Sequence, residues 1–130
     1  MVKIVTDTAS LFTAETGAAI GVTVIPLNVT IAGKTYREME EIKPAEFIKL
    51  VRQGNIPTSS QPSPGDVMEA YASASKHQPI LHIAMADGLS GSYASACAVR
   101  ETMPNREYIT VLDSRTLCGP EGALVRKAAK

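Results

Sequence analysis

The sequence predicts an α/β protein with three layers, α/β/α, in which helices cover both faces of a mostly parallel sheet. Short aliphatic runs alternate along the chain with segments whose apolar residues recur at helical spacing. This alternation favours a parallel sheet, because parallel neighbours need a crossover helix between them. The composition is that of an ordinary globular domain, with 45% hydrophobic and 20% charged residues in a chain of 130.

The first two elements follow from local signals. The aliphatic run Val2–Thr6 predicts a strand that ends at Asp7. Thr13 is a typical N-cap residue and predicts a helix over Ala14–Ile20, which Gly21 ends. The chain therefore begins with a strand and a short helix.

A longer β-branched run, Val22–Ile31, predicts the second strand. Pro26 lies inside this run and has no N–H to donate to a neighbouring strand, so the strand lies at a sheet edge or bends there. Residues 32–34 predict a turn, and residues 35–37 are expected to fold back as the second strand of a hairpin.

The rest of the chain continues the alternation. A helix with an apolar stripe is predicted from Pro44 to its stop at Gly54, followed by a polar loop over Asn55–Gln61. Ser63 is expected to cap the next helix. The remaining expected elements are strands at Ile80–Ala86 and Tyr108–Leu112 and helices at about Ser92–Met103 and Gly122–Lys130.

Charge and cysteine content argue against several classes of protein. Thirteen basic residues balance thirteen acidic ones, whereas nucleic-acid binding through phosphates needs a basic excess. Cys97 and Cys118 provide neither a disulfide framework nor a metal site. No apolar run is long enough for stable membrane insertion, and no signal-peptide pattern precedes Asp7. A cytoplasmic protein with reduced cysteines is therefore predicted.

Polar clusters rich in hydroxyl groups lie where the predicted strands end or the predicted helices begin. They are Asp7–Ser10, Thr58–Gln61, Asp87–Ser92 and Asp113–Thr116. Ligands of open α/β sheets bind beyond the carboxyl ends of the strands. Hydroxyl groups with free backbone N–H groups suit a carboxylate or a phosphate. The alternative is that these Ser, Thr and Asp residues only cap helices.

No residue is assigned a catalytic role. Gly88–Gly91 differs in its glycine spacing from the nucleophile elbow of hydrolases, and it lacks the ending of a phosphate-binding P-loop. His77 is expected to be solvated and His82 to lie in the core, so a serine hydrolase would lack its base. The acidic stretch Glu38–Glu41 indicates a solvated turn rather than a metal site. No metal and no cofactor are therefore predicted.

Six motifs follow one another in a fixed order over nearly the whole chain. They are Lys3–Ser10, Val24–Val29, Gly33–Arg37, Pro57–Gly65, Gly88–Tyr93 and Asp113–Ser114. In this order they resemble the N-terminal domain of the DegV family, the bacterial fatty-acid-binding proteins. The resemblance implies that residues 1–130 form a DegV-like N-terminal α/β domain, separated from the C-terminal domain of a two-domain protein.

The resemblance also implies a ligand and a site. The family holds one long-chain fatty acid, whose carboxylate is bound by hydroxyl and backbone N–H groups of two loops. The residues expected at the carboxylate are Ser59, Ser60, Ser90, Gly91 and Ser92. The residues expected in a secondary rim are Asp7, Thr8, Asp113 and Ser114.

The family further implies a partner, because its members present the acid to a separate fatty acid kinase. The chain is then a lipid-binding subunit without catalysis of its own. Two alternatives stay open. One is a small enzyme or binding domain acting on a phosphorylated or carbonyl metabolite at the carboxyl-terminal rim of the strands. The other is an interaction domain whose rim residues only cap helices.

The chain departs from the family pattern at three places, one of which is the acidic stretch Glu38–Glu41 in place of a usual Asp-Gly turn. Ala86-Asp87 stands where the family often has Ser-Ser, and a carboxylate here would repel the ligand. Asp87 is therefore expected to point away from the site or to cap the following helix. Pro120-Glu121-Gly122 replaces a Gly-x-Gly loop, which changes the expected crevice beside the last helix.

Overall fold

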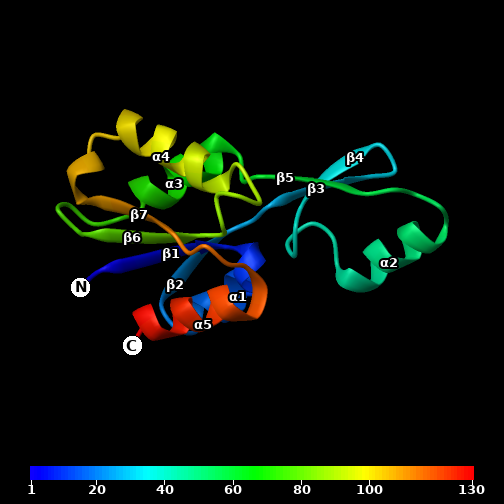
Figure 1. The fold of residues 1–130 in the computed structure, drawn as a ribbon, viewed down its shortest axis with the longest axis horizontal. Helices are drawn as coiled ribbons and strands as arrows, with labels where there is room; N and C mark the ends of the chain where they lie inside the picture. Colours follow the sequence, from blue (N-terminus) through cyan, green and yellow to red (C-terminus); the bar gives the residue numbers. More distant parts are fainter.

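The computed structural model describes all of residues 1–130 and confirms the three-layer α/β/α architecture. At its centre is a four-stranded parallel sheet with the strand order β2-β1-β6-β7 (Figure 1). The strands are β1 (Lys3–Asp7), β2 (Val22–Ile25), β6 (Ile80–Ala84) and β7 (Ile109–Asp113). The predicted aliphatic runs supply these strands, because aliphatic and β-branched side chains suit a sheet that is covered on both faces.

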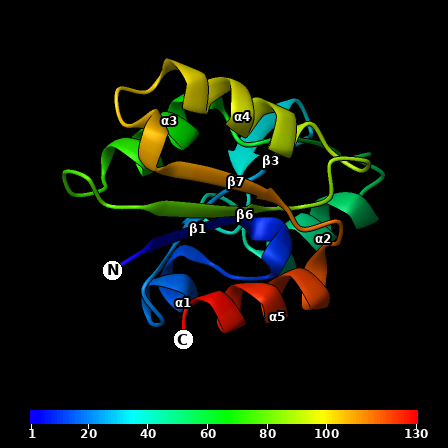
Figure 2. The same cartoon turned by 60° about the vertical axis from the view of Figure 1, so that its left-hand side comes forward.

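Helices cover both faces of this sheet, as Figure 2 shows, with α3 and α4 on one side and α1 and α5 on the other. Their bounds are α1 (Ala14–Ala18), α3 (Pro64–Ala72), α4 (Ser92–Thr102) and α5 (Cys118–Ala128). α1 connects β1 to β2 and α4 connects β6 to β7, as parallel neighbours require. No helix combines the length and the apolarity needed to cross a bilayer.

The alternation of side chains along β1 divides the core in two. Val5 is buried on the α3/α4 side in one cluster with Tyr71. Its neighbour Ile4 is buried on the α1/α5 side in a second cluster with Phe12 and Val125. Successive side chains of a strand point to opposite faces, so the strand fills both halves of the core.

The run Val22–Ile31 forms two strands, because Pro26 divides it. The first part, β2, is an edge strand of the parallel sheet, where the missing N–H of the proline costs no ladder bond. The second part, β3 (Asn28–Ile31), leaves for a separate antiparallel sheet with the strand order β4-β3-β5. The predicted edge position and bend are confirmed, and the expectation of one continuous strand is wrong.

The small antiparallel sheet begins with the predicted hairpin. β4 (Lys34–Arg37) returns along β3 after a turn in which Ala32 and Gly33 have positive φ angles of 51° and 76°. β5 (Thr58–Ser60) pairs with the other edge of β3. This strand corrects the sequence prediction of a polar loop, because its pairing partner lies far away along the chain and leaves no local signal.

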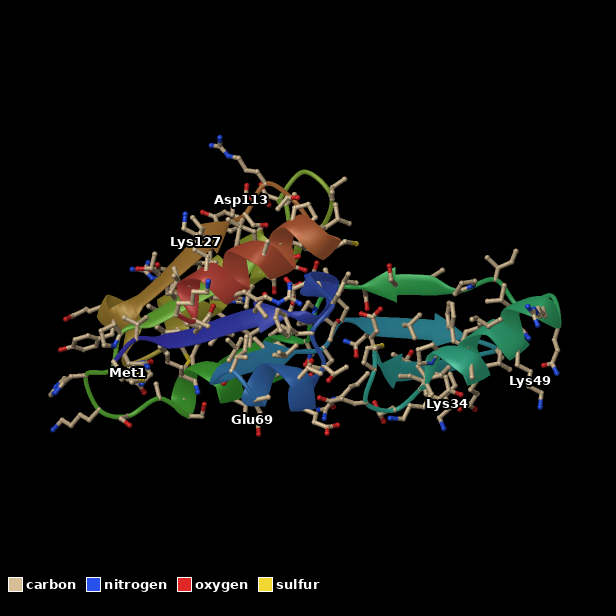
Figure 3. All side chains as sticks on the ribbon, turned by 90° about the horizontal axis from the view of Figure 1, so that it is seen from below. Met1, Lys34, Lys49, Glu69, Asp113 and Lys127 are labelled. Atoms are coloured by element: carbon tan, nitrogen blue, oxygen red, sulfur yellow. The ribbon has the colours of Figure 1, made fainter.

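α2 (Pro44–Arg52) ends just before Gly54, as predicted, but its apolar stripe is only partly covered. Ile48 and Val51 of this stripe are 47% and 40% exposed. With the small sheet, α2 forms a lobe beside the main body, and Figure 3 shows Lys34 and Lys49 at the end of the molecule opposite Met1. Side-chain contacts such as the ion pair of Arg37 with Asp66 join this lobe to the main body.

α5 begins at Cys118, earlier than the expected start at Gly122. Its N-cap residue, Leu117, has no side-chain acceptor for the free N–H groups, so the sequence carries no cap signal at this point. Pro120 lies in the first turn, where a backbone N–H has no partner inside the helix. A proline there is compatible with the helix rather than a stop before it.

Candidate functional site

Three of the predicted polar clusters share one rim of the molecule. β1 ends at Asp7, β6 at Ala84 and β7 at Asp113, and the strands are parallel. The clusters Asp7–Ser10, Asp87–Ser92 and Asp113–Thr116 therefore follow the carboxyl ends of adjacent strands. This is the edge at which open α/β sheets bind ligands.

The loop between β6 and α4 brings Ser90 and Ser92 together. Their hydroxyl oxygens lie 2.8 Å apart, and the backbone N–H of Ser92 donates to Ser90 Oγ over 3.2 Å. Ser92 is buried, whereas Ser90 is half-buried and Gly91 is exposed. The half-buried Ser90 hydroxyl thus bonds to the first residue of α4, and it lies beside the exposed Gly91, the N-cap residue of this helix.

The predicted loop over Thr58–Gln61 lies directly beside the loop between β6 and α4. The carboxamide of Gln61 lies so close to Gly91 that a Cβ atom at position 91 would overlap it. Ser59 and Ser60 are the last two residues of β5 and lie directly before Gln61. Both are exposed. The structure therefore brings together the two loops that the resemblance assigned to a carboxylate.

An apolar pocket of about 210 Å³ lies between β3, the segment that follows β4, and the start of α2. Its apolar lining residues are Val29, Met39, Ile42, Pro44 and Phe47, beside Glu38 and Lys43. Val29 pairs directly with Ser59, and side chains of paired residues lie on the same face of a sheet. The Ser59 hydroxyl and the Val29 wall of the pocket therefore share one face.

Asp7 and Thr8 of the expected secondary rim are buried and already used inside the fold. Thr8 Oγ1 donates to Glu38 Oε2 over 2.5 Å and accepts the N–H of Leu27 over 3.0 Å. Asp7 accepts two backbone N–H groups with its two carboxylate oxygens. In this structure both residues build the frame of the rim rather than its surface.

Asp113 and Ser114 organise the neighbouring loop. Asp113 Oδ1 accepts the N–H of Asp87 over 3.2 Å and the N–H of Arg115 over 2.9 Å. Ser114 Oγ donates to the carbonyl of Thr116 over 3.1 Å. The side chain of Asp87 is exposed and does not cap α4, so its backbone is held while its carboxylate stays in solvent.

Glu121 is the residue of this region that sequence reasoning missed. Its side chain is 0% exposed and accepts a hydrogen bond from Thr6 Oγ1 over 3.4 Å. Burial, with the charge of Asp7, raises the pKa of Glu121 to about 9. In the sequence it is one more acid in a helical first turn, and nothing local distinguishes it from the exposed Glu46 of α2.

The two histidines occupy the places predicted for them. His77 is exposed, and His82 is buried in the sheet with its Nδ1 2.7 Å from the hydroxyl of Tyr71. Burial lowers the pKa of His82 to about 4, so the ring is neutral at physiological pH. Neither histidine lies at the rim.

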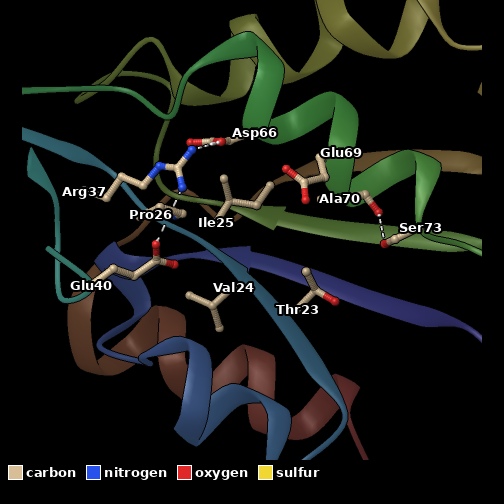
Figure 4. Close-up of a pocket in the computed structure, with 10 residues that line it drawn as sticks. All are labelled: Thr23, Val24, Ile25, Pro26, Arg37, Glu40, Asp66, Glu69, Ala70 and Ser73. Carbon is tan, nitrogen blue, oxygen red and sulfur yellow. Dashed lines mark hydrogen bonds and ion pairs between the residues drawn. The ribbon is translucent and has the colours of Figure 1, made fainter.

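A second pocket, of about 250 Å³, lies along β2 and is shown in Figure 4. Arg37 is its one basic residue, and its guanidinium lies 2.9 Å from Asp66 Oδ1 and 4.0 Å from Glu40 Oε2. Since two carboxylates already surround it, Arg37 is not a free partner for an anionic ligand. Its ion pair with Asp66 instead joins β4 to the start of α3, a contact typically worth less than about 1 kcal/mol at a surface.

Comparison with known proteins agrees with the fold and with the arrangement of the loops. A family model described as "Uncharacterised protein, DegV family" matches residues 1–130, the whole chain. The chain belongs to the DegV family. The family resemblance drawn from the ordered motifs is thereby confirmed.

Individual relatives agree with the DegV assignment. A DegV domain-containing protein of Caldanaerobacter subterraneus is 37% identical over 130 residues, which are 99% of this chain and 46% of that protein. A DegV family protein from Thermus thermophilus, solved in a study of its fatty acid binding, superposes with a TM-score of 0.86 at 35% identity, over 98% of this chain and 46% of that one. A stearic-acid-binding protein from Eubacterium ventriosum gives a TM-score of 0.88 at 25% identity, over 99% and 46%. The chain spans about half the length of these relatives.

Proposed function

We propose that this chain binds a long-chain fatty acid, with the carboxylate held between the β5 loop and the start of α4. The observation that supports the proposal is the contact of the Gln61 carboxamide with Gly91, which joins the end of β5 to the loop that carries Ser90. Relatives of the same fold are described as fatty-acid-binding. The proposed carboxylate residues are Ser59, Ser60, Ser90, Gly91 and Ser92.

The chemistry of these groups suits a carboxylate. A carboxylate that leaves water needs hydrogen-bond donors to compensate its lost hydration. Ser59 and Ser90 offer hydroxyl donors, and the backbone at Gly91 offers the N–H side of a helix start. No guanidinium or ammonium group is required, because several neutral donors share one negative charge.

The acyl chain supplies most of the affinity. At roughly 0.8 kcal/mol per buried CH₂ group, a 16-carbon acid has on the order of 10 kcal/mol available. The apolar pocket beside Val29 lies on the same face of the small sheet as Ser59, and we assign part of the chain to it. Its volume of about 210 Å³ lies below the roughly 300–1,000 Å³ of complete ligand pockets, so it holds only part of a long acid.

We further propose that residues 1–130 are the N-terminal domain of a two-domain protein and supply one half of the acid site. The match to only 46% of each relative supports this division. The chain would bind the acid without transforming it and present it to a separate fatty acid kinase. No histidine lies near Ser90, since His77 and His82 lie elsewhere, and this supports a binding role over a metabolite-converting enzyme that uses a serine–histidine pair.

Native mass spectrometry and fatty-acid titration test the proposal. The double variant Ser59→Ala/Ser90→Ala should weaken palmitate binding at least about tenfold, because lost hydrogen bonds to a charged group are worth roughly 1.5–3 kcal/mol each. Ser75→Ala is the matched control, since this exposed serine lies in the loop before β6 and its hydroxyl makes no hydrogen bond. Equal palmitate binding by the wild type and the double variant would instead support the alternative in which the rim residues only cap helices.

A further inference from the structure

The strand β7 forms an open edge of the main sheet, on the side opposite β2, and it pairs with β6 alone. Ser114, directly after this strand, donates its N–H to the carbonyl of Ala84 over 3.0 Å, so its backbone faces β6. The backbone groups of successive residues in a strand alternate in direction. Val111 and Asp113 therefore direct their N–H and C=O groups outward, away from β6.

The outward-facing backbone groups of β7 differ along the strand. Ile109 also faces outward, but its N–H donates to the carbonyl of Arg106 and its C=O accepts Nε of Arg100 over 2.6 Å. The N–H and C=O of Val111, in contrast, form no hydrogen bond within the chain. The middle of the strand therefore offers a free donor and a free acceptor, and such an unpaired edge can bind a further strand.

The side chains of β7 add an exposed apolar group to this edge. Ile109 and Val111 pack against the core on the α3/α4 side. Thr110 and Leu112 point to the opposite face, because successive side chains of a strand alternate. Both are exposed, Leu112 by 44%. Burial of this leucine against a partner would contribute to binding at the edge.

A second copy of the chain offers matching groups for this edge. In an antiparallel pair, two residues directly opposite one another exchange both backbone hydrogen bonds. When β7 pairs with β7 of a second copy around a two-fold axis at Val111, the two Val111 residues form such a pair. Thr110 of each copy then lies opposite Leu112 of the other, so both exposed leucines gain a cross-strand neighbour.

Charged side chains at the two ends of β7 favour this register. Glu107 lies four residues before Val111, and Arg115 lies four residues after it. Both are exposed, and neither forms an ion pair within the chain. Antiparallel pairing around Val111 therefore brings Arg115 of each copy toward Glu107 of the other, which makes the edge complementary to itself in charge.

Two-fold registers shifted by one residue would bring like charges together. With the axis at position 110, Glu107 of one copy faces Asp113 of the other. With the axis at position 112, Arg115 faces Ile109, whose carbonyl holds the side chain of Arg100. Like charges opposite one another destabilise a strand pair, so electrostatics selects the register centred on position 111.

We propose that β7 is a self-pairing surface, through which two copies of this chain associate as antiparallel edge strands centred on Val111. The main sheets of the two copies then form one continuous sheet. Two short strands make a small contact compared with an obligate interface, so the dimer is weak and its population depends on concentration. The proposal does not depend on the ligand of the rim.

Sedimentation velocity of the chain, from about 10 µM to about 1 mM, tests the association. We expect a shift with rising concentration toward twice the mass of the chain. Glu107→Arg should weaken self-association at least about tenfold, because both symmetry-related charge pairs become repulsive. Adding Arg115→Glu should restore it, since the exchanged charges attract again. Glu46→Arg is the matched control, because it makes the same charge change at an exposed acid of α2.

Amide hydrogen exchange of the wild type tests the register. The N–H of Val111 should exchange rapidly in dilute protein and become protected at high concentration. The N–H of Leu112 faces β6 and should be protected at both concentrations. A chain that stays monomeric at the highest concentration would overturn the proposal. Association that leaves the exchange of Val111 unchanged, or that Glu107→Arg does not weaken, would overturn it as well.

Discussion

The carboxamide of Gln61 packs against the backbone of Gly91, and this contact joins the small antiparallel sheet to the start of α4. Each residue belongs to a different sheet system, since Gln61 follows β5 and Gly91 follows β6. The contact therefore makes one rim out of two structural units. It also explains why position 91 has no side chain.

Replacing Gly91 by alanine should move Gln61 and weaken fatty-acid binding. The new Cβ would overlap the Gln61 carboxamide, but this flexible side chain can swing away, so we expect less than about 1 kcal/mol of lost stability. The φ of Gly91 is −73°, which alanine adopts without strain. Titration with palmitate and urea unfolding would measure the two effects separately.

The matched control for this change is Gly65→Ala in the first turn of α3, where a Cβ meets nothing within 4 Å. It should leave binding unchanged. Adding Gln61→Ala to Gly91→Ala removes the overlap and should restore part of the affinity. A Gly91→Ala variant with wild-type affinity would contradict the assigned contact between the loops.

Replacing Gly122 by alanine should destabilise the fold itself. A Cβ at this position would lie 2.6 Å from the carbonyl oxygen of Ser10, and a backbone atom cannot move aside as a side chain can. We expect a loss of roughly 1–3 kcal/mol in the free energy of unfolding. Gly119→Ala in the same helix meets nothing within 4 Å and should be neutral or slightly stabilising. Equal unfolding midpoints for the two variants would refute the close approach of α5 to Ser10.

The buried acid should make stability fall with rising pH. The pKa of Glu121 is about 9 in the folded chain and 4.5 as its ordinary value, so between these values the folded state binds a proton that the unfolded state releases. Unfolding is then favoured as pH rises through this window, by up to about 1.4 kcal/mol per pH unit. The excess stability of wild type over Glu121→Gln in urea should decrease from about pH 5 to pH 9, whereas a constant or growing excess would contradict the prediction.

Removal of the Tyr71 hydroxyl should cost about 1–3 kcal/mol, because Tyr71→Phe leaves the buried Nδ1 of His82 without its hydrogen-bond partner. Tyr108→Phe is the control, since Tyr108 is 37% exposed and its hydroxyl makes no side-chain hydrogen bond. Thermal and urea unfolding would compare the two. Similar losses in both variants would show that the hydroxyl–imidazole bond contributes little.

Much of the fold could be predicted because its signals are local. Thr13 forms the expected cap, with Thr16 completing a reciprocal capping box, and Ser63 caps α3 through the N–H of Asp66. Pro26 marks the edge of the parallel sheet, since a residue without an N–H is tolerated there. These features depend on a few neighbouring residues, and such residues are visible in the sequence.

Other features depend on partners that lie far away along the chain. Thr58–Ser60 forms a strand only because β3 offers its free edge. Glu121 is buried only because α5 packs its first turn against β1 and Asp7. Neither relation leaves a local pattern. The sequence therefore indicated a polar loop at Thr58–Ser60, and it did not distinguish Glu121 from the exposed acidic residues of other helix starts.

The proposed hydroxyl donors Ser59 and Ser90 stand on the two different sheet systems, and this arrangement has a thermodynamic consequence. The small sheet is joined to the main body by polar side-chain contacts such as those of Thr8 with Glu38 and Arg37 with Asp66. A ligand that bonds to both serines would act as a clamp across this junction. By linkage, a ligand that bonds to both serines stabilises the arrangement in which the two sheets lie together. The free energy of this stabilisation equals the binding free energy that the ligand would lose if the two sheets separated.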